Sequence, residues 1–403
     1  MFVGKKSCIN WIQSKLRDPS IQKTSNRLVF FLLTFAISGC IEPYRPKDIS
    51  ETVDTYVVSG RVTSMPGYHI VRVSKSSPIV NPKFIPVSNC VVKITDTESN
   101  VFLCDSIGEN GEYPIWIGEE YLSIGKGFKV SVHTPEGIEI ESEFDYLKPC
   151  PEIANIYYER VDIPTTDPLY FEKGIQFMID LQADESFDRF FRWEIEETYE
   201  YRASYPIRYY YIGWMVWLPQ PDYSRFYCWA TNPILNIYTL STKGLQENRF
   251  LGYKLHFVDN HTQRLMYMYS LKVTQHALSE SYFNYLEQLR VNTSEQGGLF
   301  DTQPISITGN LYSTNAPNVK ILGFFGASSV KSTRVFFSDI ENLRFDLYNK
   351  CTLYIVDYTL DIFTPDEYPV YFLHQDGGFW WANQDCFDCT KAGGTTEKPP
   401  FWP

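Results

Sequence analysis

Short runs that alternate apolar and polar residues follow one another from residue 52 onward. The first five are rich in β-branched residues and cover 56–62, 69–73, 91–95, 128–132 and 138–140. A period of two predicts strands with one buried face, and turns containing Asn, Gly and Pro separate the runs. Several short strands at this spacing indicate a small β-sandwich over residues 52–148.

A second β-rich region begins at the break formed by Pro149 and Pro151. Its expected strands are 175–180, 191–196, 209–217, 234–240, 251–258, 266–273, 319–325, 332–337 and 353–355. Residues 149–403 therefore predict a larger, sandwich-like β domain.

One helix is expected within this larger domain. Ser279 is a suitable N-cap, and Tyr282, Phe283, Leu286 and Leu289 follow at spacings that place them on one helical face. Together these patterns predict an all-β fold with one short helix. The N-terminal sandwich is expected to be immunoglobulin- or transthyretin-like, because residues 86–96 (PVSNCVVKITD) and 108–113 (GENGEY) resemble the transthyretin-like sandwich.

Charge is distributed unevenly along the chain, which has 403 residues and a net charge of −12. The first 39 residues carry six bases and one acid, and an apolar run at 28–37 follows the bases. This order predicts a signal peptide over 1–39, since ten residues are fewer than the ~20 that span a bilayer as a helix. Ile37-Ser38-Gly39-Cys40 resembles the bacterial lipobox, so we expect lipidation at Cys40, a membrane anchor and an extended tether over 40–51.

The remaining 364 residues hold 30 bases and 47 acids, a net charge of −17. An acidic body of this kind argues against nucleic acid as a partner, because phosphate binding needs a concentrated basic surface. Nothing in the chain predicts a cofactor, since it has no Gly-rich phosphate loop.

Seven of the nine cysteines remain after Cys8 in the leader and the lipidated Cys40. Disulfides persist in exported proteins, and we expect Cys228, Cys351, Cys386 and Cys389 to form two bridges that hold the tail to the larger domain. Cys386 and Cys389 also have the spacing of a metal half-site or a redox pair. No second such pair and no His pair of metal-binding spacing accompanies them, so no metal site is expected.

Aromatic residues are densest at 209–217, and a second group follows at 377–381. Rings suit the stacking of sugars or the docking of a partner protein, which makes Trp214, Trp217, Trp380 and Trp381 the candidate contact residues. The alternative is that these rings fill a sandwich core. Trp380 and Trp381 are neighbours, so on a strand they point to opposite faces.

The candidate acidic side chains for hydrolysis are Asp184, Asp188, Glu194, Glu196, Glu197 and Glu200. Glycosidases need two carboxylates facing each other across a cleft, whereas Glu194 and Glu196 lie on the polar face of a predicted strand. The chain also lacks a Gly-x-Ser-x-Gly elbow and a His-Glu-x-x-His pair. We therefore expect no catalytic residues and no enzyme activity.

Nearly the whole mature chain, including the lipobox followed by a β-sandwich, resembles a family of Bacteroidetes-type surface lipoproteins, the domain of unknown function 4249 family. The resemblance is carried by residues 293–304 (TSEQGGLFDTQP), 307–311 (ITGNL), 322–329 (LGFFGASS), 386–396 (CFDCTKAGGTT) and 400–402 (PFW). It implies an outer-membrane, cell-surface lipoprotein that is a noncatalytic binding accessory to a TonB-dependent receptor in nutrient uptake. A surface hydrolase and a structural assembly lipoprotein are the alternatives.

Overall fold

The described part of the chain is built mainly of strands. The computed structural model describes residues 55–77, 83–106, 108–167, 169–294, 307–348, 351–356, 360 and 362–403. One α-helix, α3 (Glu280–Ser294), occurs among these residues, so the all-β fold with one short helix is confirmed. The expected signal peptide (1–39) and tether (40–51), with Cys40, lie outside the described residues.

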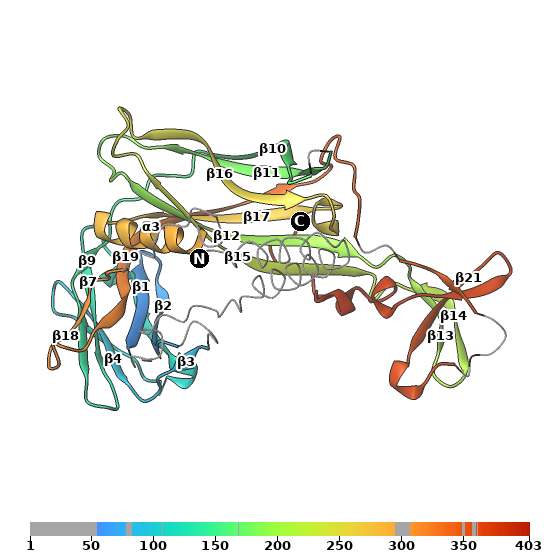
Figure 1. Ribbon diagram of the computed structural model, residues 1–403, viewed down its shortest axis with the longest axis horizontal. Coiled ribbons are helices and arrows are strands. Elements are labelled where there is room, and N and C mark those ends of the chain that lie inside the picture. The colour runs from blue at the N-terminus through green and yellow to red at the C-terminus, as the bar shows by residue number, and fades with distance from the viewer. Residues whose placement is uncertain are drawn as a thin grey trace, which may run out of the picture. The chain divides into compact units, whose positions relative to one another are not determined.

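The largest sheet of the described residues has eight strands and is here called the large sheet (Figure 1). Its strands run in the order β15 (Tyr227–Ser241), β12 (Phe190–Arg202), β17 (Tyr269–Ala277), β19 (Ile321–Phe337), β1 (Tyr56–Thr63), β2 (Gly67–Lys75) and β3 (Ile85–Pro86), and β6 (Glu112–Ile117) pairs with β2. β1 and β19 run parallel, whereas the other pairings within this sheet are antiparallel.

β19 links the two halves of the large sheet. Its first half pairs with β1 and its second half with β17. The sequence predicted two strands here, at 319–325 and 332–337, but the structure contains one strand of 17 residues. A small residue is required at Gly326, since a Cβ there would lie 2.4 Å from the ring of Tyr282 on α3.

A second sheet packs on the β1 half of the large sheet. Its order is β18 (Leu311–Ser313), β8 (Glu139–Ser142), β7 (Gly127–His133), β4 (Val91–Asp96) and β5 (Val101–Leu103), and β9 (Asp145–Tyr146) pairs with β7. Fully buried Val58, Val71, Ile94, Val130 and Phe325 fill the core between them. The expected domain boundary at 148–149 therefore encloses only part of this sandwich. Two later segments, β18 and the first half of β19, also contribute strands to it.

A three-stranded sheet packs on the β17 half of the large sheet. It consists of β10 (Asn155–Pro164), β11 (Phe171–Gln182) and β16 (Arg249–Asp259), and its core includes Phe177, Trp193 and Tyr269. In β19, Phe325 belongs to the first core and Val335 to the second, and the two positions differ by an even number of residues. Side chains alternate along a strand, so both packed sheets use the same face of the large sheet.

The opposite face of the large sheet receives α3. Ser279 caps the helix, its Oγ accepting a hydrogen bond from Tyr282 N–H at 3.2 Å. Tyr282, Phe283 and Leu286 are buried and pack with Phe324 of β19, as the spacing predicted. The helix position and its apolar face are therefore confirmed.

A five-stranded sheet, here called the small sheet, follows the order β14 (Met215–Asp222), β13 (Ile207–Tyr211), β21 (Val370–Gln375), β22 (Gly378–Trp381) and β20 (Tyr354–Ile355). The strand predicted over 209–217 is two strands, because the chain turns at 212–214. Gly213 has φ +90°, a backbone conformation that glycine adopts without steric cost. Short 3₁₀ helices complete the described structure: η2 (Glu109–Gly111), η3 (Glu119–Tyr121), η4 (Gln263–Leu265), η5 (Pro365–Glu367), η6 (Gln384–Cys386) and η7 (Cys389–Ala392).

Candidate functional site

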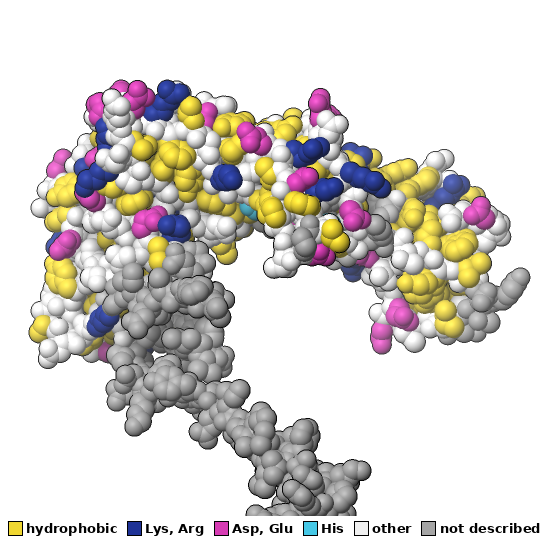
Figure 2. Space-filling view, turned by 45° about the horizontal axis from the view of Figure 1, so that its top comes forward, with side chains coloured by type: hydrophobic (Ala, Val, Ile, Leu, Met, Phe, Trp, Pro, Cys, Tyr) yellow, Lys and Arg dark blue, Asp and Glu magenta, His cyan; other side chains and the backbone are white. Residues whose placement is uncertain are grey.

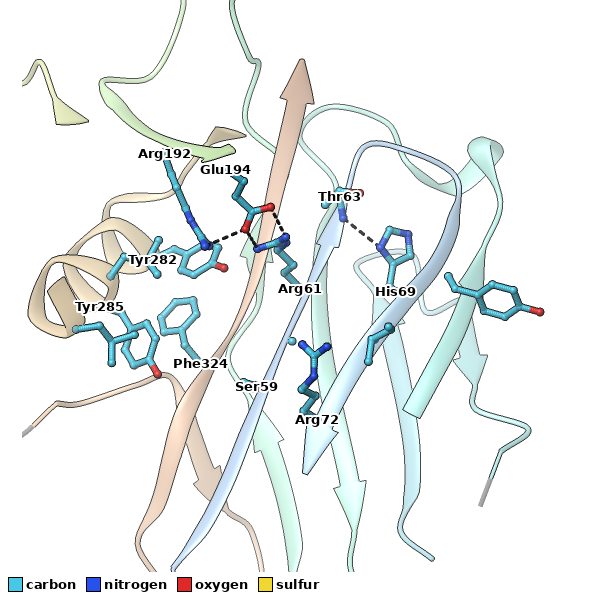
Figure 3. Close-up of a pocket in the computed structure, with 15 residues that line it drawn as sticks. Ser59, Arg61, Thr63, His69, Arg72, Arg192, Glu194, Tyr282, Tyr285 and Phe324 are labelled. Atoms are coloured by element: carbon cyan, nitrogen blue, oxygen red, sulfur yellow. Dashed lines mark hydrogen bonds and ion pairs between the residues drawn. The ribbon is translucent and has the colours of Figure 1, made fainter. Parts of the chain in front are cut away.

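Four polar side chains from four neighbouring strands lie on the α3 face of the large sheet, and we call them the polar row. They are Glu194 of β12, His276 of β17, Ser328 of β19 and Arg61 of β1. The Arg61 guanidinium donates to both Glu194 oxygens, each at 2.6 Å (Figure 3). His276 Nε2 lies 3.3 Å from Glu194 Oε2, and its Nδ1 lies 3.0 Å from Ser328 Oγ. The polar row thus joins the two halves of the large sheet.

The charges of the polar row follow from its burial. Burial by itself raises the pKa of Glu194, but His276, Arg61 and Arg192 together hold this pKa well below its ordinary value. Burial lowers the pKa of His276 to about 4, although Glu194 opposes that shift. At neutral pH, Glu194 is therefore a carboxylate and His276 is neutral, with Nε2–H facing Glu194 and Nδ1 accepting from the Ser328 hydroxyl.

Ser328, His276 and Glu194 contain the residue types of a serine–histidine–acid triad. Ser328 is fully buried, with none of its surface exposed, so no scissile carbonyl reaches its Oγ. The arrangement instead pairs Arg61 with Glu194 and His276 Nδ1 with Ser328, while His276 Nε2 faces Glu194 without a well-directed hydrogen bond.

The other carboxylates considered for hydrolysis have partners of their own. Glu196 pairs with Arg334 at 2.5 Å, and buried Glu197 accepts a hydrogen bond from Tyr269 Oη at 2.9 Å. Glu196 and Glu197 are neighbours on β12, so their side chains point to opposite faces of the sheet.

A pocket of about 580 Å³ lies beside the polar row. One wall comes from α3 and β19 and is apolar, with Tyr282 stacked on Phe324 at a ring-centroid distance of 4.9 Å (Figure 3). The other wall comes from β1, β2 and β12 and is polar; it includes Arg61, Arg72, Arg192 and Glu194. The volume is within the range of small-molecule sites, ~300–1,000 Å³.

Two donors at this pocket have no hydrogen-bond partner among the described residues. One is Nε of Arg192, whose Nη2 lies 2.9 Å from Glu194 Oε1. The other is Nε2 of His69, since Nδ1 of this ring accepts from Thr63 N–H at 3.3 Å. Burial, aided by the charge of Arg61, lowers the pKa of His69 to about 4, so its single proton at neutral pH is on Nε2.

The sequence analysis missed this pocket almost entirely. It placed Glu194 on the polar face of a strand, which is correct, but it singled out neither Arg61 nor His276. Arg61 and Glu194 are 133 residues apart, and nothing local in either segment indicates that they meet. The alternation of Arg192 and Glu194 with apolar neighbours was the one available signal.

The four candidate tryptophans all belong to the small sheet region, but they occupy different environments. Trp214, in the turn before β14, is 65% exposed, and Trp217 on β14 is 59% exposed. Trp381 packs on Phe363 and Tyr354 at ring-centroid distances of 5.3 and 5.1 Å. Trp380 lies on the opposite face, since the register pairs it with Leu373 and pairs Trp381 with Phe372.

The register of the small sheet brings one row of rings onto a single face. Trp217 pairs with Tyr209, Tyr209 with Phe372, and Phe372 with Trp381. Directly paired residues project to the same side, so Trp217 and Trp381 share a face and are separated by two strands. Hydrophobic side chains gather over the small sheet in Figure 2.

One disulfide joins the tail to the large sheet, and a second lies within the small sheet region, where Cys351 and Cys386 share a hydrophobic cluster with Ile207 and Tyr371. Cys228 of β15 is bonded to Cys389 of η7, and Cys351 is bonded to Cys386 of η6. The four cysteines are those that the sequence analysis selected. Of the remaining described cysteines, Cys90, Cys104 and Cys150 are free thiols.

The described residues contain no cluster of three or more His, Cys, Asp or Glu that could hold a metal ion. No helix in the described part of the chain combines the length and apolar character needed to cross a membrane.

Comparison with protein families identifies the family of this chain. A search of curated proteins finds no relative of this chain. The model of the family described as Domain of unknown function (DUF4249) matches residues 41–334, which is more than half of the chain. The match includes both packed sheets, the polar row and α3. The chain therefore belongs to the DUF4249 family.

Proposed function

We propose that this protein is a lipid-anchored lipoprotein of the outer membrane, exposed at the cell surface, and that it is a noncatalytic binding accessory to a TonB-dependent receptor in nutrient uptake. The lipobox-like segment ending at Cys40 supports the anchor. Family membership supports the receptor as partner, through the resemblance described above.

The observation that carries the binding role is the exposure of Trp214 and Trp217. Large rings at the surface leave apolar area in contact with water, and burial of that area drives association. Tryptophan is among the residues that contribute most to protein–protein interfaces. The small sheet holds both side chains on a hairpin, so little conformational freedom is lost when a partner covers them.

The experiment is recovery of copurifying proteins with the affinity-tagged lipoprotein from detergent-solubilised membranes. We expect a TonB-dependent receptor with the wild-type protein and about tenfold less of it with the Trp214→Ala/Trp217→Ala variant, because loss of an interface anchor costs over ~1 kcal/mol. Trp116→Ala is the matched control, since Trp116 is 58% exposed but lies on β6. Recovery of no receptor by the wild-type protein contradicts the proposal, and equal recovery by all three proteins contradicts the assignment of the contact to the small sheet.

A further inference from the structure

The pocket beside the polar row has more positive than negative charge. Arg61 and Arg192 both contact the single carboxylate of Glu194. Arg72, at the rim, has its own partner in Glu112 at 2.8 Å. The nearby His69 and His276 are neutral, because burial lowers both pKa values. Within the described residues, one positive charge of the Arg61–Arg192 pair is therefore not balanced at this pocket.

That charge lies where water screens it poorly. The Arg192 side chain is only 17% exposed, and its Nε has no acceptor among the described residues. Two largely buried guanidinium groups that share one carboxylate are only partly compensated, so an anion that entered the pocket would gain from pairing with them. One surplus charge matches a monoanion, and a guanidinium presents parallel N–H groups that fit the two oxygens of a carboxylate.

The opposite wall supplies a different kind of contact. Tyr282 and Tyr285 of α3 both stack on Phe324, with interplanar angles of 5° and 29°. Leu286 and Leu289 extend this wall along the helix. The wall is therefore flat and apolar, and it suits a ring or another flat apolar group of a ligand.

We infer that this pocket binds a small monocarboxylate with an apolar ring, its carboxylate beside Arg61 and Arg192 and its ring against Tyr282 and Tyr285. The inference names the ligand class for the proposed binding role, and it rests on that function for its biological setting. The pocket is formed by α3 and the large sheet, whereas the proposed receptor contact is on the small sheet.

Binding is tested with the purified folded protein, by saturation-transfer NMR and calorimetric titration. The probes are phenylacetate and cyclohexylacetate, each compared with its neutral amide, which has the same ring and nearly the same shape. We expect both acids to bind at least about tenfold more tightly than the amides, because only the acids form charge-assisted hydrogen bonds. Failure of both acids to bind, or equal binding of acids and amides, overturns the inference.

Three variants locate the site. Arg192→Gln removes the surplus charge and should weaken acid binding about tenfold. Leu289→Trp fills the pocket without a change of charge and should weaken acids and amides alike. Arg334→Gln is the matched control, because Arg334 lies on the same strand as Phe324 and pairs with Glu196 outside this pocket. Unchanged binding in both pocket variants, with melting temperatures near that of the wild type, overturns the assignment.

The receptor experiment and the ligand-binding experiment test different proposals, so a negative result in one does not contradict the other. Phenylacetate binding needs no receptor, so loss of receptor recovery in the tryptophan variant leaves it intact. Conversely, a protein that binds neither acid but still recovers the receptor contradicts the pocket inference alone.

Discussion

The polar row and the small sheet are each stabilised by a different kind of interaction. The polar row joins four strands through charged and polar side chains that are largely buried, with Arg61 and Glu194 as its ion pair. The small sheet relies on rings and on the Cys351–Cys386 disulfide within its region, and the Cys228–Cys389 disulfide joins the tail that follows it to β15. Its most exposed tryptophans, Trp214 and Trp217, contribute little to that packing. Removing one partner of the polar row would leave a buried charge without compensation, whereas a disulfide holds its two segments together whatever side chains the nearby surface exposes.

The largest expected effect comes from the disulfide between Cys228 and Cys389. Its partners are 161 residues apart, so its loss frees a long loop in the unfolded chain. Cys228→Ser should lower the free energy of unfolding of this region by about 5 kcal/mol in a chain-entropy model. Cys351→Ser opens a separation of 35 residues and should cost about 1 kcal/mol less. Urea titration with limited proteolysis measures both, with Cys104→Ser as the control; equal losses contradict the loop-length argument.

A second prediction concerns the loss of stability at acidic pH. His69 has a folded-state pKa of about 4, below its ordinary 6.5, so the folded protein resists protonation there. Its contribution to stability is complete above pH ~6.5 and is lost as the pH falls through 6.5 toward 4. His69→Gln should therefore reduce the loss of unfolding free energy over this interval by an amount of order 3 kcal/mol.

Urea titrations at both ends of that pH interval measure this loss. His133→Gln is the matched control, since His133 is exposed on β7, and this variant should follow the wild type. If His69→Gln loses as much stability as the wild type, the His69 ring is not held neutral by its surroundings.

A third prediction breaks the ion pair of the polar row. Glu194→Gln leaves Arg61 and Arg192 without a carboxylate. Both Arg61 and Glu194 side chains are 32% exposed, so the cost is expected at about 2 kcal/mol, below the value for a fully buried pair. Glu112→Gln removes the partner of the exposed Arg72 and should cost under ~0.5 kcal/mol. Equal stability of both variants in thermal unfolding contradicts a structural role for the polar row.

The smallest effect on stability is expected from the exposed tryptophans. Trp214→Ala and Trp217→Ala should each change the free energy of unfolding by less than ~0.5 kcal/mol, because both rings are largely exposed and contribute little to the packing of the fold. Trp381→Ala removes contacts to Phe363 and Tyr354 and should cost clearly more, of order 2 kcal/mol. Calorimetric melting distinguishes these cases, and a large loss in Trp214→Ala would show that this ring belongs to the core.

The sequence predicted helices and strands correctly where their position depends on residues close to one another in the chain. Ser279 caps α3 because its side chain reaches a backbone N–H three residues later. The strands at 191–196 and 175–180 were predicted from the alternation of apolar and polar residues. Successive side chains of a strand point to opposite faces, so this alternation marks a strand with one buried face. By contrast, the strand predicted over 209–217 was divided at Gly213, and two predicted strands proved to be the single β19.

The candidate sites show the same limit more strongly. Trp214, Trp217, Trp380 and Trp381 were selected together, and the opposite faces of Trp380 and Trp381 were expected, but only the structure shows that Trp214 and Trp217 are exposed while Trp380 and Trp381 are partly buried. The pocket was not predicted, because its walls come from β1, β2, β12, β19 and α3. The neighbours of each wall residue in the sequence carry no signal that marks it as part of a pocket.

The sequence by itself determined the alternation that makes strands, the cap and apolar face of α3, and the set of cysteines available for bridges. These depend on residues within a few positions of one another, or on residue type. The tertiary structure alone decided that β19 would join the two halves of the large sheet, that Arg61 would meet Glu194, and that an apolar helix face would lie opposite a cationic wall. Those features depend on which strands pair across more than a hundred residues, and pairing is selected by the packing of the whole sheet.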